Sequence, residues 1–127
     1  MSPSTLIVCV DHDSAALKVR TLILSHSGYR VLSAESEETA LRLFRLNKVD
    51  LVIIDPPSPE ATRSDVIDEM KRINPKLSVI VFTGLMDLPE GFEQADLVLT
   101  KCITPPEFLA AVAAVVLKLR ASVTEGE

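Results

Sequence analysis

The stretch that decides the fold is DLVIIDPPSP, residues 50–59. Its aliphatic run, LVII, is typical of a strand that is covered on both faces of a sheet. The run ends in one carboxylate, Asp55, and three of the next four residues are prolines, which fix the backbone of a turn. The sequence therefore predicts a buried strand that presents Asp55 at its carboxyl end. In a plainer interpretation, Asp55 only begins a turn, as Asp often does before Pro.

Four other apolar runs have the same character, and amphipathic segments of helical length lie between them. Strands are expected at residues 6–10, 30–34, 51–55, 78–82 and 96–100. Helices are expected at residues 14–27, 37–46, 63–73 and from 105 onward, with a short one at 88–94 that is interrupted by a proline and a glycine. Strands that alternate with helices indicate an α/β fold with a parallel sheet.

Single residues mark the faces and ends of the expected helices. Leu17, Thr21 and Leu24 recur at helical spacing and predict the buried face of the first helix. Ser36 is placed to cap the second helix, and TPPE at 104–107 has the form of a capping box for the last one. The third helix is expected to bury four apolar residues, namely Val66, Ile67, Met70 and Ile73. The last helix is apolar over more than one face, which a contact with a partner would explain and alanine's helix propensity explains equally well.

Composition limits the classes of function. The 127 residues fit one domain, with a core at about 6–117 and a polar, frayed tail at 121–127. The net charge of −5 argues against a nucleic-acid partner. We find no leader-like segment and no apolar run that could span a bilayer, so we expect a cytoplasmic protein without a membrane partner. Cys9 and Cys102 are far apart, and we expect both to be reduced.

Polar residues gather where four of the expected strands end. In chain order they are Asp11, His12 and Asp13; Asp55; Thr83 and Gly84; and Lys101. In a parallel sheet these ends lie at one edge, where α/β proteins bind their ligands. Neighbouring carboxylates attract a hard cation such as Mg²⁺, and a hydroxyl with a lysine can hold phosphoryl oxygens. The sequence thus predicts a site for phosphoryl transfer to a carboxylate.

This arrangement resembles the receiver domain of two-component response regulators over about residues 6–117. Asp11, Asp55, Thr83 and Lys101 match that family's motifs in order and spacing, and Pro59 matches a proline that usually follows the phosphoacceptor. The resemblance implies a flavodoxin-like, doubly wound, five-stranded parallel sheet with strand order 2-1-3-4-5 and five helices. It also implies a stand-alone receiver domain without enzymatic activity beyond its own phosphorylation.

The resemblance assigns roles to residues. Asp55 would accept a phosphoryl group from a sensor histidine kinase or a phosphotransfer protein. Mg²⁺ would be held by Asp11, Asp55 and the backbone carbonyl of Pro57, with Asp13 or His12 as further candidates. The phosphate and switch positions would be Thr83, Gly84 and Lys101, and the switch-aromatic position falls at Val98. A downstream protein, or a second copy in a homodimer, would bind the face formed by residues 88–94, the fifth strand and the last helix.

Several departures from the family pattern fall on this chemistry. His12 stands where the family has a second acid, and imidazole is a poor ligand for Mg²⁺. Pro56 and Pro57 offer no backbone N–H groups to a phosphate. Cys102 replaces a proline, which makes a cis peptide there unfavourable. Val98 replaces the usual aromatic residue. We therefore expect weakened binding of Mg²⁺ and phosphate, with a pseudo-receiver that acts as a phosphorylation-independent interaction module as the alternative.

A third interpretation comes from the enzymes. VDHDSA, residues 10–15, also resembles the opening motif of haloacid-dehalogenase-like phosphatases. That resemblance would make Asp11 a nucleophile and Asp13 a general acid. It leaves Asp55 without a role, and the acidic pair that the family needs after the lysine is absent from the sequence.

Overall fold

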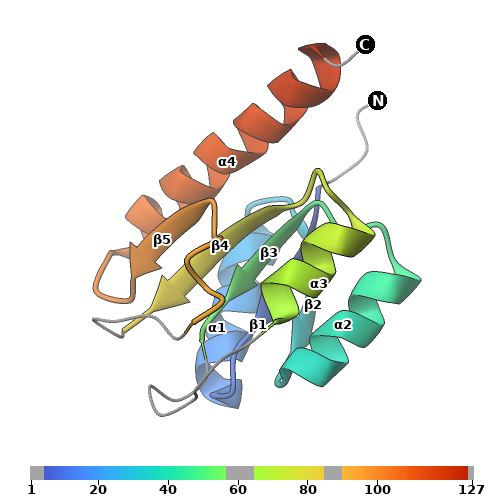
Figure 1. Ribbon diagram of the computed structural model, residues 1–127. Coiled ribbons are helices and arrows are strands. Elements are labelled where there is room, and N and C mark those ends of the chain that lie inside the picture. Colours follow the sequence, from blue (N-terminus) through green and yellow to red (C-terminus); the bar gives the residue numbers. More distant parts are fainter. Residues whose placement is uncertain (1–4, 57–64, 85–89, 126–127) are drawn as a thin grey trace.

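The computed structural model describes residues 5–56, 65–84 and 90–125, and side chains up to Arg120. Five parallel strands form one sheet in the order β2-β1-β3-β4-β5. The strands are β1 (Leu6–Val10), β2 (Arg30–Ala34), β3 (Leu51–Ile54), β4 (Ser78–Thr83) and β5 (Leu97–Thr100). The helices are α1 (Ser14–His26), α2 (Glu37–Leu46), α3 (Val66–Ile73) and α4 (Pro105–Glu125). The predicted sheet and its strand order are confirmed (Figure 1).

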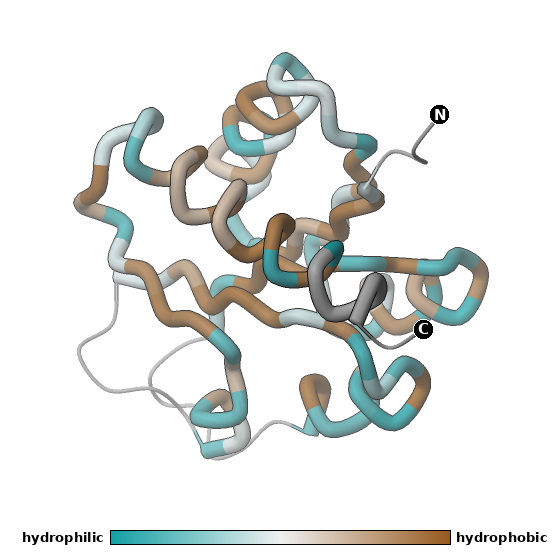
Figure 2. The backbone as a smooth tube through the Cα atoms, turned by 90° about the horizontal axis from the view of Figure 1, so that it is seen from above, coloured by the Kyte–Doolittle hydropathy of each residue, from teal (hydrophilic) through white to brown (hydrophobic). Residues whose placement is uncertain are grey.

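Alternation along the central strands builds a core on each face of the sheet. One core packs every second residue of β1, β3 and β4 against α2 and α3; its members include Val8, Ile54, Val81, Phe44 and Met70. The other packs the intervening residues against α1 and α4; it includes Ile7, Ile53, Leu24, Phe108 and Val112. Side chains of a strand point to opposite faces in turn, so a wholly apolar strand must be covered on both sides. Hydrophobic segments accordingly run through the centre of the molecule in Figure 2, with hydrophilic turns around them.

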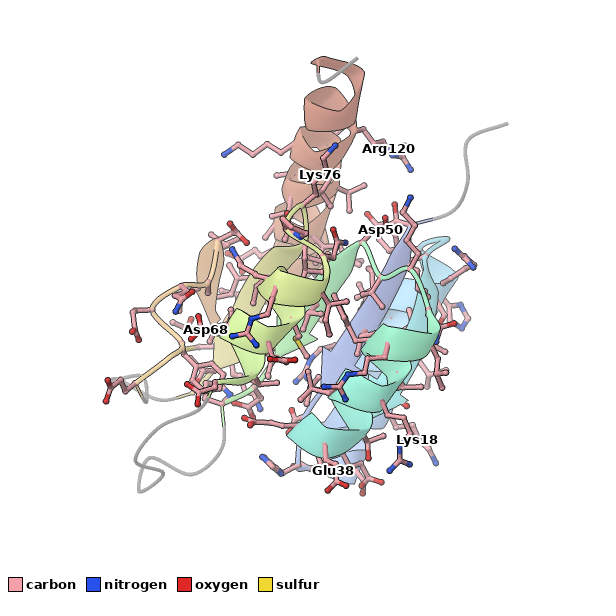
Figure 3. The ribbon with its side chains drawn as sticks, turned by 45° about the vertical axis from the view of Figure 1, so that its right-hand side comes forward. Lys18, Glu38, Asp50, Asp68, Lys76 and Arg120 are labelled. Carbon is pink, nitrogen blue, oxygen red and sulfur yellow. The ribbon has the colours of Figure 1, made fainter. Side chains whose placement is uncertain are left out.

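Two aspartates fasten the amino edge of the sheet in the same way. The backbone N–H of Asp50 donates to the carbonyl of Leu6, and its carboxylate accepts the N–H of Leu6 at 2.9 Å. Asp96 makes the same two hydrogen bonds with Val79: its N–H donates to the Val79 carbonyl, and its carboxylate accepts the Val79 N–H at 2.7 Å. Both precede a Leu-Val pair that begins a strand. The edge that carries Asp50 lies opposite the one near Glu38 (Figure 3), so these bonds set the strand register from the end away from the predicted site.

The helix ends follow the sequence signals closely. The hydroxyl of Ser36 accepts the N–H of Thr39 and caps α2. At α4 the capping box is complete, because Thr104 N–H donates to Glu107 and Glu107 N–H donates to the hydroxyl of Thr104. The hydrogen bond from the Thr104 backbone lowers the pKa of the exposed Glu107 carboxyl. After α1 the chain turns through Gly28, whose φ of 96° is a conformation that favours glycine.

The structure corrects four details of the predicted helices. The face that α1 buries is Leu17, Arg20 and Leu24, whereas Thr21 is half-buried and donates its hydroxyl to the Leu17 carbonyl. Ile73, expected in the core, ends α3 at 41% exposure. Two segments differ as well. Residues 90–94 contain a β-bridge at Glu90 followed by a turn, rather than part of a helix, and α4 remains helical to Glu125 instead of fraying at 121.

The turn at residues 90–94 is held by apolar burial rather than by helical hydrogen bonds. Phe92 is completely buried and belongs to the core that faces α2 and α3. Gly91 precedes it with a φ of 101°, which ends any regular helix at that point. The expected helix at 88–94 therefore has no helical counterpart in residues 90–94, while 88 and 89 lie outside the described residues. Four helices, not five, are present in the described part of the chain.

Both cysteines are free thiols. Cys9 lies in β1 with no exposed surface, and burial raises its pKa to about 12, so it remains protonated at neutral pH. No helix within the described ranges has the length and apolar character needed to cross a membrane.

Replacing Asp50 with Ala tests the role of the amino edge. The change leaves the Leu6 N–H without its partner and should lower the free energy of unfolding by about 1–2 kcal/mol, measured by urea denaturation. Asp50→Asn keeps an oxygen acceptor, so its loss of unfolding free energy should be less than half of that of Asp50→Ala. Equal stability of the wild type and Asp50→Ala would show that this bond does not hold the edge.

Candidate functional site

Three charged residues lie one position beyond their strands, and backbone hydrogen bonds fix each of them. Asp11 N–H donates to the carbonyl of Ala34 at 3.1 Å, and Asp55 N–H donates to that of Val10 at 2.9 Å. Lys101 N–H donates to the carbonyl of Thr83 at 2.9 Å. Each bond continues the ladder of a parallel strand pair past the last strand residue. The carboxyl edge of the sheet therefore sets the positions of these three side chains.

Lys101 joins the two carboxylates. Its Nζ lies 2.6 Å from Oδ2 of Asp55 and 3.1 Å from Oδ2 of Asp11. The Asp11 side chain is 2% exposed and that of Asp55 is 18% exposed. Charge-assisted hydrogen bonds of this length are the strong ones in proteins. The predicted gathering of Asp11, Asp55 and Lys101 is thus what the structure shows.

Arg20, which the sequence patterns did not single out, belongs to the same cluster. Its Nη1 donates to Oδ2 of Asp11 at 3.1 Å, and its side chain is 7% exposed. Its Cζ lies 4.6 Å from the centre of the Phe82 ring, a distance typical of a cation–π contact. The signal was present in the spacing of α1, because Arg20 lies three residues after Leu17 and four before Leu24. An arginine on the buried stripe of a helix needs a buried partner.

The three residues of the DHD motif, 11–13, have different surroundings. Asp11 Oδ1 accepts the backbone N–H of Asp13 at 2.9 Å, which closes the turn into α1. Asp13 is the N-cap of α1, and its carboxylate accepts the N–H groups of Ala15 and Ala16. His12 is exposed. Asp13 therefore acts as the cap of α1.

Of the remaining predicted residues, Thr83 and Gly84 lie at the same edge. Thr83 ends β4 and is buried, and Gly84 follows it in an exposed bend with open space around its Cα. Val98, at the switch-aromatic position on β5, is 47% exposed. The peptide bonds of the described residues are trans, including that between Lys101 and Cys102, as expected without the proline. Pro57 and Pro59 lie outside the described residues.

The two carboxyl groups have opposite pKa shifts. Burial alone would raise the pKa of Asp11, but the hydrogen bond from Asp13 N–H, followed by the contacts with Lys101 and Arg20, brings it below the ordinary value of 3.8. For Asp55 burial prevails over the hydrogen bond from Lys101, and its pKa is raised. Burial works against the charge of Lys101 too, yet its hydrogen bonds to Asp55 and Asp11 raise its pKa. Asp11 therefore stays ionised to a lower pH than an ordinary aspartate, whereas Asp55 becomes protonated at a higher pH than usual.

The described side chains fit a magnesium ion poorly. Residues 5–56, 65–84 and 90–125 contain no group of three or more His, Cys, Asp or Glu side chains that could hold a metal. Both oxygens of Asp11 already accept hydrogen bonds, and Oδ2 accepts two from cationic groups. Asp55 and Asp11 are the carboxylates that could contribute, and the predicted carbonyl ligand of Pro57 lies outside the described residues. A divalent cation at Oδ2 of Asp11 would compete with Arg20 and Lys101 for that oxygen.

The fold and this edge define a doubly wound α/β domain with an acid–lysine site at the end of its central strands. Residues 7–113 of this chain match the response regulator receiver domain family. The chain belongs to that family. The predicted resemblance is therefore confirmed, and with it the two-component signalling class of the domain. The family match gives no support to the phosphatase interpretation, in which Asp11 would be a nucleophile.

The chain matches segments of longer regulatory proteins. The transcriptional regulatory protein GlrR of Escherichia coli K12 is 34% identical over 85 residues, which are 67% of this chain and 19% of GlrR. The probable transcriptional regulator ycf27 of Guillardia theta is 31% identical over 113 residues, 86% of this chain and 44% of its own length. The chain thus spans less than half the length of these curated relatives.

Solved structures show the same fold. A receiver domain protein from Methanospirillum hungatei superposes with a TM-score of 0.83 at 22% identity, over 94% of this chain and 99% of that one. The response regulator protein TrrA of Thermotoga maritima, in complex with Mg²⁺ and BeF, gives a TM-score of 0.74 at 26% identity, over 87% and 97% of the two chains.

Neutralising Asp11 should cost far more stability than neutralising its neighbour. Asp11→Asn leaves the buried Arg20 without its carboxylate, and we expect it to lower the free energy of unfolding by roughly 3–5 kcal/mol. Asp13→Asn removes the same charge two residues away but keeps a good helix cap, and should change it by less than about 0.5 kcal/mol. Urea denaturation measures both. Similar losses in the two variants would mean that the Asp11–Arg20 pair does not support the fold.

The cost of Asp11→Asn should also depend on pH. The pKa of Asp11 is lower in the folded chain than its ordinary value of 3.8. Its stabilisation is therefore complete above the ordinary pKa and is lost as the pH falls through the lowered one. The difference in unfolding free energy between wild type and Asp11→Asn should be constant from pH 7 to about pH 5 and shrink on further acidification. A difference that grows below pH 4 would contradict this sign.

Proposed function

We propose that this receiver domain takes part in a phosphorelay, in which Asp55 accepts a phosphoryl group from a histidine kinase or a phosphotransfer protein. The observation that carries the proposal is the position of Asp55 at the end of β3, partly exposed and 2.6 Å from Lys101 Nζ. Burial raises the pKa of Asp55 despite its hydrogen bond from Lys101, and a carboxyl group with a perturbed pKa at the end of a strand is typical of a functional site. We infer no enzymatic activity beyond this self-phosphorylation.

Asp55 and Lys101 have clear roles in such a transfer. An oxygen of the ionised Asp55 attacks phosphorus, and the bond between phosphorus and the donor nitrogen breaks. Lys101 can then move its ammonium group from the Asp55 carboxylate to a phosphoryl oxygen, since it is 31% exposed and has a flexible side chain. Thr83 is placed beside it at the end of β4, where its hydroxyl could bind a second phosphoryl oxygen.

We propose further that Mg²⁺ binding is weak in this chain. Asp11 and Asp55 would be its side-chain ligands, and Pro57 could add its carbonyl. The crowding of Asp11 by Arg20 and Lys101 supports the proposal, as does the exposed histidine where the family has a second acid.

A second function is favoured by one specific observation. Lys101 and Arg20 already neutralise the two carboxylates of the site, so the site is electrostatically satisfied without a metal or a phosphoryl group. A receiver of this kind could act as a phosphorylation-independent interaction module. In either case we propose that the output is protein binding at the surface made by the turn 90–94, β5 and α4. Val98 and Leu117 expose apolar side chains on β5 and α4, which suits a downstream protein or a second copy.

Intact mass after incubation with acetyl phosphate and MgCl₂ decides between the two functions. The wild type should gain the mass of one phosphoryl group, and Asp55→Asn should gain none. Lys101→Ala should gain less because it removes the cation beside Asp55. A folded wild type that gains no mass at any Mg²⁺ or Mn²⁺ concentration would favour the interaction module.

A further inference from the structure

The charges of the site add up to zero without any ligand. Asp11 and Asp55 carry two negative charges, and Arg20 and Lys101 carry two positive ones. Both cations contact the same oxygen, Oδ2 of Asp11. Two carboxylates that face each other repel, and this repulsion is what normally makes such a pair attract a divalent cation. Here the protein's own side chains remove it.

The two cations are held very differently. Lys101 is 31% exposed, and its chain of methylenes can turn toward another partner. Arg20 is 7% exposed and reaches Asp11 from inside the molecule. Its guanidinium lies on the ring of Phe82, which in turn contacts Phe108 of α4 at a centroid distance of 5.0 Å. Arg20 of α1 is thus linked through Phe82 of β4 to Phe108 of α4.

We propose that Arg20 is the resident counter-cation of this site: it occupies Asp11 in place of a divalent metal and so sets the domain's low affinity for one. The proposal extends the function proposed above by naming the residue responsible for weak metal binding. Arg20 touches neither a substrate nor a reacting atom, so it acts through the Asp11 carboxylate. The sequence departure at His12 removes one acid from the family pattern, and Arg20 adds one cation, so both changes disfavour a divalent ion.

Mn²⁺ binding tests this directly, read as the loss of the free-ion signal in electron paramagnetic resonance. Arg20→Gln leaves Asp11 paired with Lys101 and removes the buried charge; it should bind Mn²⁺ at least about tenfold more tightly than the wild type. Arg20→Lys restores a cation and should bind Mn²⁺ nearly as weakly as the wild type. Lys18→Gln is the matched control, because it removes one positive charge from the exposed side of the same helix (Figure 3) and should leave the affinity unchanged.

An Arg20→Gln protein that is folded, by circular dichroism, and binds Mn²⁺ no more tightly than the wild type would overturn the proposal. The proposal would equally fail if Lys18→Gln tightened binding as much as Arg20→Gln, since any loss of charge would then have the effect. Should Arg20→Gln not fold, Arg20→Met keeps the apolar contacts with Phe82 and carries the same expectation. No phosphoryl donor is used, so the result does not depend on whether Asp55 is phosphorylated. The variants in the mass measurement all keep Arg20, so the two experiments can fail separately.

Discussion

The buried carboxylate of Asp11 is the interaction on which the rest of this site depends. It lies at the end of β1, a central strand of the sheet, and it links three other parts of the chain. One oxygen fixes the turn into α1 through the N–H of Asp13, and the other binds Arg20 of α1 and Lys101 after β5. A buried charge of this kind is tolerated only when its hydrogen bonds are complete. Asp11 therefore constrains where α1 begins and where Lys101 points, and through Lys101 it constrains Asp55.

The outline of the fold could be predicted because each element carries its own signal. The β-branched runs of β1, β3 and β4 have no polar face, which requires cover on both sides of the sheet and hence a parallel arrangement. Ser36 and the capping box of α4 fixed two helix starts to the residue. The turn at 90–94 escaped prediction because a single buried side chain, Phe92, decides its position, and no local pattern reports such a contact.

The site was predictable for a different reason and only in part. Asp11, Asp55 and Lys101 follow directly after strands, and parallel strands bring their carboxyl ends together, so topology alone places the three side chains. Arg20 lies in the middle of a helix, where a charged residue is ordinarily solvent-exposed. To predict the role of Arg20, one would have to notice that it lies on the buried face of α1. A buried positive charge needs a negative partner, and Asp11 at the end of β1 provides it. Asp13 could be assigned only from its hydrogen bonds, since a metal ligand and a helix cap look alike in sequence.

Membership of the receiver domain family is consistent with the chemistry of this site. The fold is that of a receiver domain, and Asp11, Asp55 and Lys101 form an acid–lysine cluster at the carboxyl edge of its sheet, with Arg20 buried beside them. Two cations of the protein pair with the carboxylates of this cluster: Lys101 is partly exposed, whereas Arg20 is buried. In the function proposed above, Lys101 moves from Asp55 to the phosphoryl group, while Arg20 remains paired with Asp11.

The most direct test of the role of Asp11 is a double-mutant cycle between Asp11 and Arg20, measured by urea denaturation in EDTA. The variants are Asp11→Asn, Arg20→Gln and the combination of both. A metal-independent, buried ion pair predicts a coupling energy of about 2 kcal/mol or more, with the double variant more stable than the sum of the single losses implies. Losses that add to within about 0.5 kcal/mol would show that the two side chains do not stabilise each other, and the central claim would be wrong.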